Sequence, residues 1–336
     1  MKFYIGDYTT EGSIGVALCS LENNVLSLIS KADTFLKSPN YTILSKDKKI
    51  LYVTTAEHSE GEETNSVAAF ALEGDEMKLV SIRSTGGLSA CHLCLSEDER
   101  FLYVANYSTG MLSVFPMNGA QIGKRIQLIE HHGSGPDYRQ ERAHLHYVCI
   151  NDNDHLLYAV DLGIDAVVSY ERDPETGLLK QHDRIDFPKG VGPRHMLFRD
   201  DIMYVACELQ SKVCTVKRKG SGWEVVQILS TVPEDFTEFT AVAAIRCFGS
   251  SIFVSNRGHH SIAQFDIQPD GTLKLRRIFS SFGDFPRDFI MLDENTALVS
   301  NQHSGDVRLI DISGSEEKQI SNTLSAPGVV CICPLD

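Results

Sequence analysis

A short phrase recurs seven times along this chain of 336 residues and limits the fold more than any other feature. Each copy has an aromatic residue or leucine, then a small or apolar pair, and a polar residue at or just after its end. The copies begin at Tyr4, Tyr52, Tyr103, Tyr158, Tyr204, Phe253 and Leu298. Neighbouring copies are 45 to 55 residues apart, and a period near 50 built from short β-rich runs is typical of β-propeller blades.

Each period also holds four strand-like runs. In the second period they cover residues 41–45, 50–55, 67–72 and 79–83, and polar turns separate them. Their β-branched, aromatic and small apolar residues fit strands joined by hairpin turns. The pattern predicts an all-β chain with four strands in each blade.

The two ends of the sequence predict how the ring closes. The first copy of the phrase, at Tyr4, has no strand-like run before it, whereas the apolar run at 328–333 has nothing after it. We predict that three N-terminal strands and this C-terminal strand together form the seventh blade, since closing the ring removes open sheet edges. With no linker or low-complexity segment in sight, we expect one seven-bladed β-propeller domain over residues 1–336.

Charge and cysteine content narrow the classes of function. The chain has 31 basic and 45 acidic residues, a formal net charge of −14, so we expect neither nucleic acid nor an anionic membrane as a partner. An anionic small molecule can bind only where arginine or lysine is concentrated locally. Nine cysteines, mostly within apolar runs, are interpreted as reduced thiols. The N-terminus has no signal-peptide core, and we expect a cytoplasmic protein whose oligomeric state the sequence does not indicate.

Polar residues at the ends of the phrases form the first group of candidate site residues. Turn formation alone explains asparagine and aspartate at a strand end. Glu208 differs, because glutamate is not a preferred turn residue and here follows an apolar run. Asp161 and Asn256 are candidates for substrate binding because glycine follows each within two residues and allows close backbone approach.

The innermost strands supply a second group. Alignment on the phrase that follows each strand places these residues at equivalent positions: Tyr41, His92, His146, His195, Ile245 and Asp288. Arginine recurs one place earlier, at Arg194 and Arg287. His144 and His146 should share one face of a strand because side chains alternate, but zinc needs a further ligand, such as His195 or Glu208. No thiolate or carboxylate lies at a supporting spacing, so we predict neither a metal nor a cofactor. Neither a G-x-S-x-G elbow nor a P-loop is present.

These segments resemble the propeller lactonase family, which includes the bacterial propeller-type 6-phosphogluconolactonase and the fungal carboxy-muconate lactonizing enzyme. The resembling segments run in order along nearly the whole chain: Tyr4-Ile-Gly-Asp-Tyr-Thr-Thr10, His144-Leu-His146, Tyr158-Ala-Val-Asp-Leu-Gly163, Gly190-Val-Gly-Pro-Arg-His195, Glu208-Leu209, Ser255-Asn-Arg-Gly-His-His-Ser-Ile262 and Phe285-Pro-Arg-Asp-Phe289. The resemblance implies a catalytic group of His146, Arg194, Glu208 and Arg257. We add five residues as candidates for substrate binding: His144, His195, Asp161, Asn256 and Arg287.

Three functions remain open on the sequence alone. The first is hydrolysis of a sugar δ-lactone, 6-phosphogluconolactone in the pentose phosphate route, with a small anionic sugar lactone as the ligand. Glu208 or His146 would be the base, and Arg194 and Arg257 would divide the oxyanion and the phosphate between them. The second is a muconate-type lactonizing enzyme. The third is an interaction propeller without catalysis, although the only tryptophan, Trp223, precedes Glu224, so the Trp-Asp pairs of WD repeats are absent.

Overall fold

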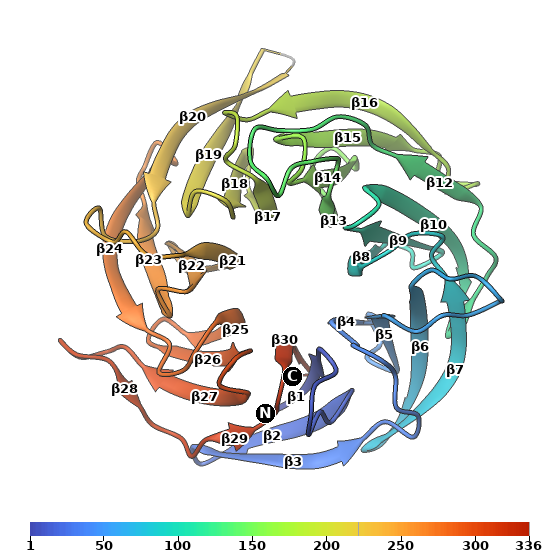
Figure 1. Cartoon of the computed structure of the whole chain (residues 1–336), viewed down its shortest axis with the longest axis horizontal. Helices are drawn as coiled ribbons and strands as arrows, with labels where there is room; N and C mark the ends of the chain where they lie inside the picture. Colours follow the sequence, from blue (N-terminus) through green and yellow to red (C-terminus); the bar gives the residue numbers. More distant parts are fainter. Residues whose placement is uncertain (221, 336) are drawn as a thin grey trace.

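The computed structural model describes residues 1–220 and 222–335, and these residues form β-strands and connecting turns without a helix. The strands make seven small antiparallel sheets, which stand radially around one axis (Figure 1). The predicted all-β, seven-bladed propeller is confirmed. None of the described segments is a helix long and apolar enough to cross a bilayer.

Within each blade the strands run in order from the innermost to the outermost. The closing blade contains β30 (Val329–Pro334), β1 (Lys2–Asp7), β2 (Ala17–Glu22) and β3 (Val25–Lys31). The next blade contains β4 (Tyr41–Leu44), β5 (Ile50–Thr55), β6 (Ser66–Glu73) and β7 (Glu76–Ser84). The third contains β8 (Ala90–Leu95), β9 (Phe101–Asn106) and β10 (Met111–Asn118), and both β11 (Gln121–Ile122) and β12 (Gln127–Glu130) pair with β10. The fourth contains β13 (Leu145–Ile150), β14 (Leu157–Asp161), β15 (Ala166–Arg172) and β16 (Leu179–Asp186).

The last three blades follow the same order. The fifth contains β17 (Pro193–Arg199), β18 (Ile202–Cys207), β19 (Lys212–Lys219) and β20 (Gly222–Ser230). The sixth contains β21 (Ala241–Phe248), β22 (Ser251–Arg257), β23 (Ser261–Ile267) and β24 (Leu273–Ser280). The seventh contains β25 (Pro286–Asp293), β26 (Thr296–Asn301) and β27 (Asp306–Asp311), and both β28 (Lys318–Gln319) and β29 (Leu324–Ser325) pair with β27.

Ring closure follows the prediction from the chain ends. Strand β30 pairs antiparallel with β1, with Tyr4 opposite Cys333 and Ile5 opposite Ile332. The backbone N–H of Tyr8 extends this pairing by donating to Gly328 O at 2.9 Å. Figure 1 shows the two termini side by side in this blade.

The repeated phrase is explained by packing between blades. Its first residue is buried to 1% exposure or less in all seven copies, at Tyr4, Tyr52, Tyr103, Tyr158, Tyr204, Phe253 and Leu298. Seven hydrophobic clusters lie between neighbouring blades, and every copy contributes its first residue to one of them. Two of the tyrosine hydroxyls also donate to a turn of the next blade, Tyr52 to Gly119 O and Tyr204 to Gly271 O. The sequence period is therefore the period of blade-to-blade packing.

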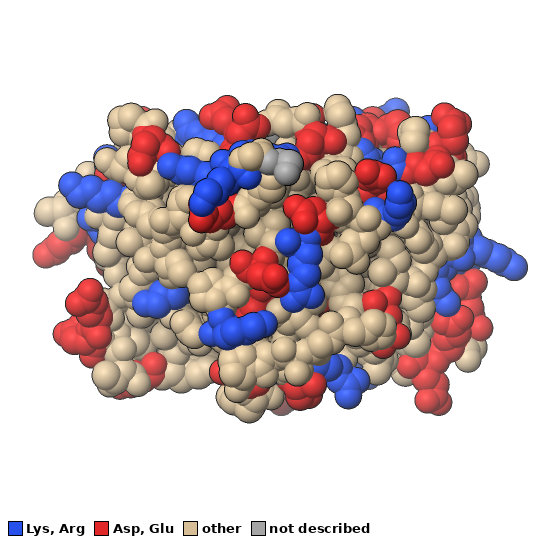
Figure 2. All heavy atoms as spheres, turned by 90° about the horizontal axis from the view of Figure 1, so that it is seen from above, with Lys and Arg blue, Asp and Glu red and all other residues tan. Residues whose placement is uncertain are grey.

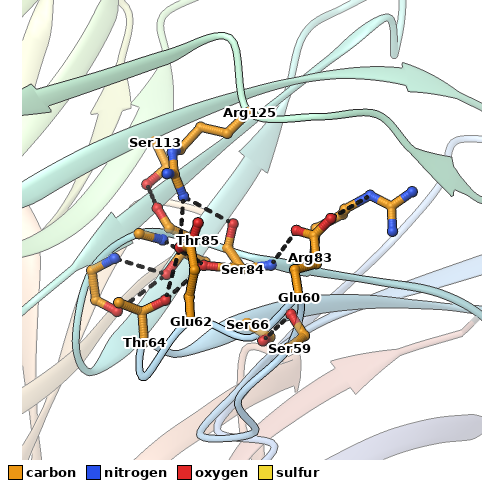
Figure 3. A network of polar contacts seen from close by, with 12 residues as sticks. Ser59, Glu60, Glu62, Thr64, Ser66, Arg83, Ser84, Thr85, Ser113 and Arg125 are labelled. Atoms are coloured by element: carbon orange, nitrogen blue, oxygen red, sulfur yellow. Dashed lines mark hydrogen bonds and ion pairs between the residues drawn. The ribbon is translucent and has the colours of Figure 1, made fainter.

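The acidic segment between β5 and β6 is held in place. Figure 3 shows two of its glutamates, Glu60 and Glu62, beside residues of β7. Glu60 accepts from the backbone N–H of Ser84 at 3.2 Å and lies 3.8 Å from Arg83 Nε. Glu62 accepts from the Ser84 hydroxyl and lies 3.5 Å from Arg125 Nη1. These contacts fix the segment at the edge of the cavity described next.

Candidate active site

A cavity of about 570 Å³ lies at the face of the ring where the innermost strands begin. Because neighbouring strands in a blade are antiparallel, the start of each innermost strand and the end of the second strand meet at this face. Its lining comes from these places in most of the blades: Tyr8, Ser38, Asn40, Ala56, Asn65, Leu88, Ser89, Cys91, Tyr107, Ser108, Arg139, His146, Glu208, Arg257 and Arg287.

Glu208 lies at the centre of the charges in this cavity and is almost completely buried. Its Oε2 forms ion pairs with Arg257 Nη2 at 2.8 Å and with Arg194 Nε at 2.9 Å. The Arg194 N–H is not aligned with this oxygen, so the second ion pair is not also a hydrogen bond. Its Oε1 accepts from Arg139 Nη2. Both carboxylate oxygens are therefore occupied by guanidinium groups.

The arginines decide the ionisation of this carboxylate. Burial alone would raise the pKa of Glu208, but the charges of Arg257, Arg194 and Arg139 outweigh burial and hold this pKa well below its ordinary value. Burial and the neighbouring positive charges lower the pKa of Arg194 to about 9, so this guanidinium remains a cation at neutral pH. The group is an ionised carboxylate between three cations.

The cavity carries an excess of positive charge in a strongly acidic chain. Arg287 also lines the cavity. Its Nη2 donates to Tyr8 Oη at 2.9 Å, and its Nη1 donates to Gln302 Oε1 at 3.2 Å. Within the described part of the chain Arg287 makes no ion pair, and Glu208 is the one acidic side chain that lines the cavity. The three arginines that line the cavity, Arg139, Arg257 and Arg287, against one carboxylate give a formal local charge of +2. Figure 2 shows that the outer side of the ring instead mixes both signs of charge.

His146 supplies an imidazole without a hydrogen-bond partner. Neither of its ring nitrogens bonds to any residue that the structure describes, although its Nδ1 is buried. Burial, and then the charge of Arg194, lower the pKa of His146 well below its ordinary value. The ring is therefore neutral at pH 7 and keeps a free lone pair beside the arginines.

A β-bulge explains how this histidine reaches the cavity. In β13 the register shifts between Leu145 and Tyr147, so His146 is an extra residue opposite β14. A bulge re-aims a side chain and breaks the alternation of faces. Tyr147, not His146, is therefore the equivalent of His92 and His195. The rings of His144 and His146 both contact Tyr107.

The same bulge recurs around the ring. Among the described strands, six of the seven innermost ones have a register shift near their start, and β4 does not. In five of these six the extra residue lines a space of about 20 Å³ that continues the cavity inward: Cys91, His146, Arg194, Arg287 and Val330. The bulges thus deliver side chains from separate blades to one place.

The predicted site residues divide into two groups. The cavity brings together His146, Glu208, Arg257 and Arg287, and its inward continuation adds Arg194 and His195. The nitrogen Nε2 of His195 lies 3.0 Å from Arg194 Nη1.

Three residues predicted to bind substrate line neither space. His144 stacks on Tyr107 at 4.5 Å between ring centroids and lies 3.1 Å from Glu141. Asn256 binds Thr231 and Ser261 within the turns. Asp161 accepts from the backbone N–H groups of His144 and Gly163. Their positions give no support to a role in substrate binding.

Sequence reasoning missed Arg139. This residue lies in the connection between β12 and β13, outside any strand and outside the repeated phrase. One signal in the sequence points to this region, because the spacing of 55 residues between Tyr103 and Tyr158 is the longest of the six. An extra stretch in one repeat is a place where a loop can add function.

Comparison with known proteins identifies the family of the chain. The sequence profile described as "Lactonase, 7-bladed beta-propeller" matches residues 2–334. The chain is 31% identical to the 6-phosphogluconolactonase of Bacillus subtilis (strain 168), over 98% of this chain and 97% of that protein.

Solved structures show the same fold. A protein from Lactobacillus plantarum superposes with a TM-score of 0.90 at 27% identity, covering 98% of both chains. The periplasmic gluconolactonase of Pseudomonas aeruginosa superposes with a TM-score of 0.88 at 23% identity, covering 99% of this chain and 98% of that one. Since the family profile matches nearly every residue, this chain belongs to the lactonase family of seven-bladed β-propellers.

Proposed function

We propose that the protein hydrolyses 6-phosphogluconolactone to 6-phosphogluconate, the lactone-opening step of the pentose phosphate route. The observation that supports this proposal most is the concentration of arginines around Glu208 beside a free imidazole. Three arginines line the cavity and give it a formal charge of +2, and Arg194 lies next to the carboxylate. The printed name of the Bacillus subtilis relative points to the same substrate. A volume of about 570 Å³ suits a small molecule.

His146 is our choice for the general base. Water must lose a proton as it attacks the lactone carbonyl, and a neutral imidazole with a free lone pair can take it. Glu208 is a poorer base, because both of its oxygens already bind arginines and its pKa is held low. Glu208 instead keeps its arginines close together in spite of their mutual repulsion.

Arg257 is our choice for the group that stabilises the oxyanion. Its Nε and Nη2 are committed to Ala241 O, Val242 O and Glu208, which fix the guanidinium on the cavity wall. Its Nη1 has no hydrogen-bond partner among the residues described and can donate to the developing charge. When the carbonyl re-forms, the bond from the carbonyl carbon to the ring oxygen breaks. The ring oxygen then takes the proton that His146 had removed from water.

The phosphate requires a cation that is not needed by the carbonyl. Arg287 fits this role, because it lines the cavity from a different blade and makes no ion pair within the described residues. A guanidinium binds phosphate with two parallel donors, which gives geometric specificity as well as charge.

The test of this proposal compares two lactones. We expect kcat/KM for 6-phosphogluconolactone to exceed that for unphosphorylated glucono-δ-lactone by about 100-fold or more, since loss of one or two charged hydrogen bonds costs about 1.5–3 kcal/mol each. Product formation is followed with an excess of a dehydrogenase that oxidises 6-phosphogluconate, and lactone opening with a pH indicator.

Each outcome of this assay has a distinct meaning. Equal kcat/KM for the two lactones would show that the arginines do not select for phosphate. No acceleration of either lactone above its spontaneous rate would refute hydrolysis, and turnover of a carboxymuconate in the same preparation would favour the lactonizing alternative.

The proposed base predicts a pH profile. We expect kcat/KM, corrected for spontaneous opening at each pH, to stay level from pH 8 down to about 6.5, the ordinary pKa of histidine. Burial lowers the pKa of His146, so protonation of the ring and loss of its lone pair occur only below that pH. Activity should then fall as the pH falls further. A profile that already declines between pH 8 and 7 would show that another group, with a higher pKa, acts as the base.

A further inference from the structure

The connection between β12 and β13 supplies the one arginine of the site, among the described residues, that does not stand on a strand. It spans residues 131–144 and carries Arg139, whereas Arg194, Arg257 and Arg287 stand on strands. An arginine on a loop has no ladder of backbone hydrogen bonds to hold its position. Something else must keep Arg139 at Glu208.

Asp161 holds both ends of this loop. Its Oδ2 lies 2.8 Å from Nδ1 of His131, the first loop residue, and His131 Nε2 lies 2.7 Å from the hydroxyl of Tyr170. Its Oδ1 accepts from the backbone N–H of His144, the last loop residue, at 2.7 Å. Asp161 is fully buried, and the His131 and Tyr170 side chains are nearly so.

The middle of the loop is tied next to Arg139. The side-chain amide of Gln140 donates to Leu162 O at 2.7 Å and to Asp165 Oδ1 at 2.8 Å. The same aspartate accepts from the backbone N–H groups of Gly190 and Gly192. These glycines lie four and two residues before Arg194 along the chain. The turn after β14 therefore positions two of the cavity arginines at once.

Comparison with the other blades shows that this arrangement is special to Arg139. At the end of the second strand three other blades have asparagine, and in two of them it binds neutral groups near the end of the preceding outermost strand, as Asn256 binds Thr231. Asn301 likewise binds Ser281 O. Only the Asp161 blade, within the described structure, replaces this neutral pair by aspartate and histidine with a buried tyrosine. The repeat is altered where the long loop begins.

We propose that Arg139 binds the anionic group of the substrate together with Arg287, and that Asp161 and His131 are positioning residues for Arg139. Arg139 lines the cavity, uses Nη2 for Glu208, and has the hydroxyl of Tyr107, another lining residue, beside its guanidinium. This inference rests on the proposed function for the identity of the anion. A purely structural role for the Asp161 group predicts loss of stability without any selective change in phosphate affinity.

The experiment is a double-mutant cycle on the two lactones. Arg139→Gln should raise KM for 6-phosphogluconolactone by about 10-fold with kcat within roughly threefold, as expected for loss of one charged hydrogen bond. His131→Ala should raise the same KM by about fivefold. In the Arg139→Gln background, His131→Ala should add less than about twofold, because its effect passes through Arg139. Neither variant should change kcat/KM for the unphosphorylated lactone by more than about threefold.

Two further variants complete the set. Asp161→Asn is the conservative exchange at a positioning residue: an asparagine can accept from His144 N and Gly163 N and donate to His131, so this variant should raise KM by less than His131→Ala does. Arg142→Gln removes an exposed arginine of the same loop, which pairs only with Glu141 among the described residues, and should change nothing. Melting temperatures of all variants separate affinity from stability.

Binding of inorganic phosphate, measured by calorimetry, separates this inference from the proposed function. If wild type does not open the lactone but Arg139→Gln still weakens phosphate binding by several-fold, the function fails and the anion site stands. If His131→Ala lowers the melting temperature yet leaves KM unchanged, or if its effect multiplies with that of Arg139→Gln, the positioning role is refuted. Unchanged KM and unchanged phosphate affinity in Arg139→Gln would remove Arg139 from the site.

Discussion

Replacing His146 with glutamine should lower kcat by about 10²–10⁴-fold on both lactones, the range expected for loss of a general base. KM should change little, because no substrate charge is assigned to the ring. The fold should tolerate the change, since neither ring nitrogen of His146 bonds to another described residue. Single-turnover and steady-state kinetics, with the melting temperature as a check, measure the effect.

The neighbouring histidine provides the matched comparison. His144 is two residues away, but it does not line the cavity: its ring stacks on Tyr107 and lies beside Glu141. His144→Gln should lower kcat by less than about tenfold. Equal losses in the two variants would mean that His146 has no role that His144 lacks. If His146→Gln keeps nearly wild-type kcat, His146 is not the general base, and Glu208 becomes the candidate for that role.

Most of the fold was predictable because packing between blades repeats. The phrase that begins at Tyr52 recurs because every blade must bury an aromatic or leucine against the next, and the hydrophobic pattern records this. The end of the chain was equally informative. A lone apolar run at 328–333 needed a partner strand, and β1 lacked an inner neighbour.

The site was predictable only in part, and the bulges explain why. Alternation of faces is a rule for regular strands, and each bulge breaks it by one residue. Sequence alignment therefore grouped His146 with His195, although its true equivalents are Arg194 and Arg287. The residue types still indicated a site, because arginine and histidine rarely occur at the start of a buried strand without a partner.

Arg139 and Asp161 show a second limit. Nothing in the residues near Arg139 distinguishes it from an exposed loop arginine, since its contact with Glu208 joins positions 69 residues apart. Asp161 was noticed, but its contacts face the loop and the turn and not the cavity. Such contacts depend on the three-dimensional arrangement of blades, which a single sequence does not specify.

Removing residues from Gly328 onward should prevent stable folding or lower the melting temperature by more than about 20 °C. The deleted strand β30 is the innermost strand of its blade and includes three well-buried aliphatic side chains, Val329, Val330 and Ile332. Burial of each contributes about 1.5–3 kcal/mol, and their sum approaches the whole stability of about 5–15 kcal/mol usual for a folded protein. Thermal unfolding followed by circular dichroism measures the loss.

A buried ion pair adds to this effect. The Oδ2 of Asp288, on the neighbouring blade, accepts from the backbone N–H of Ile332 at 3.0 Å, and its Oδ1 binds Arg246. Deletion of β30 leaves this buried carboxylate with one partner fewer, and a buried charge that loses a hydrogen bond is costly. A truncated protein that melts within a few degrees of the full chain would refute closure by β30.

Two glycine-to-alanine variants test the same closure by adding a single methyl group to the chain. Gly328 has a φ of +76°, and an added Cβ would lie less than 3.0 Å from the carbonyl oxygen of Tyr8, where β30 begins to pair with β1. Gly74 has a φ of +63°, but an added Cβ would meet nothing within 4 Å. Both alanine variants carry the strain of a left-handed residue, about 1 kcal/mol, and only Gly328→Ala must also push the closing strands apart. We therefore expect Gly74→Ala to lower the melting temperature by about 2 °C and Gly328→Ala by roughly 5 °C or more. Equal shifts for the two variants would mean that strands β1 and β30 accommodate the added methyl group without loss of stability, and that their junction does not determine the stability of the ring.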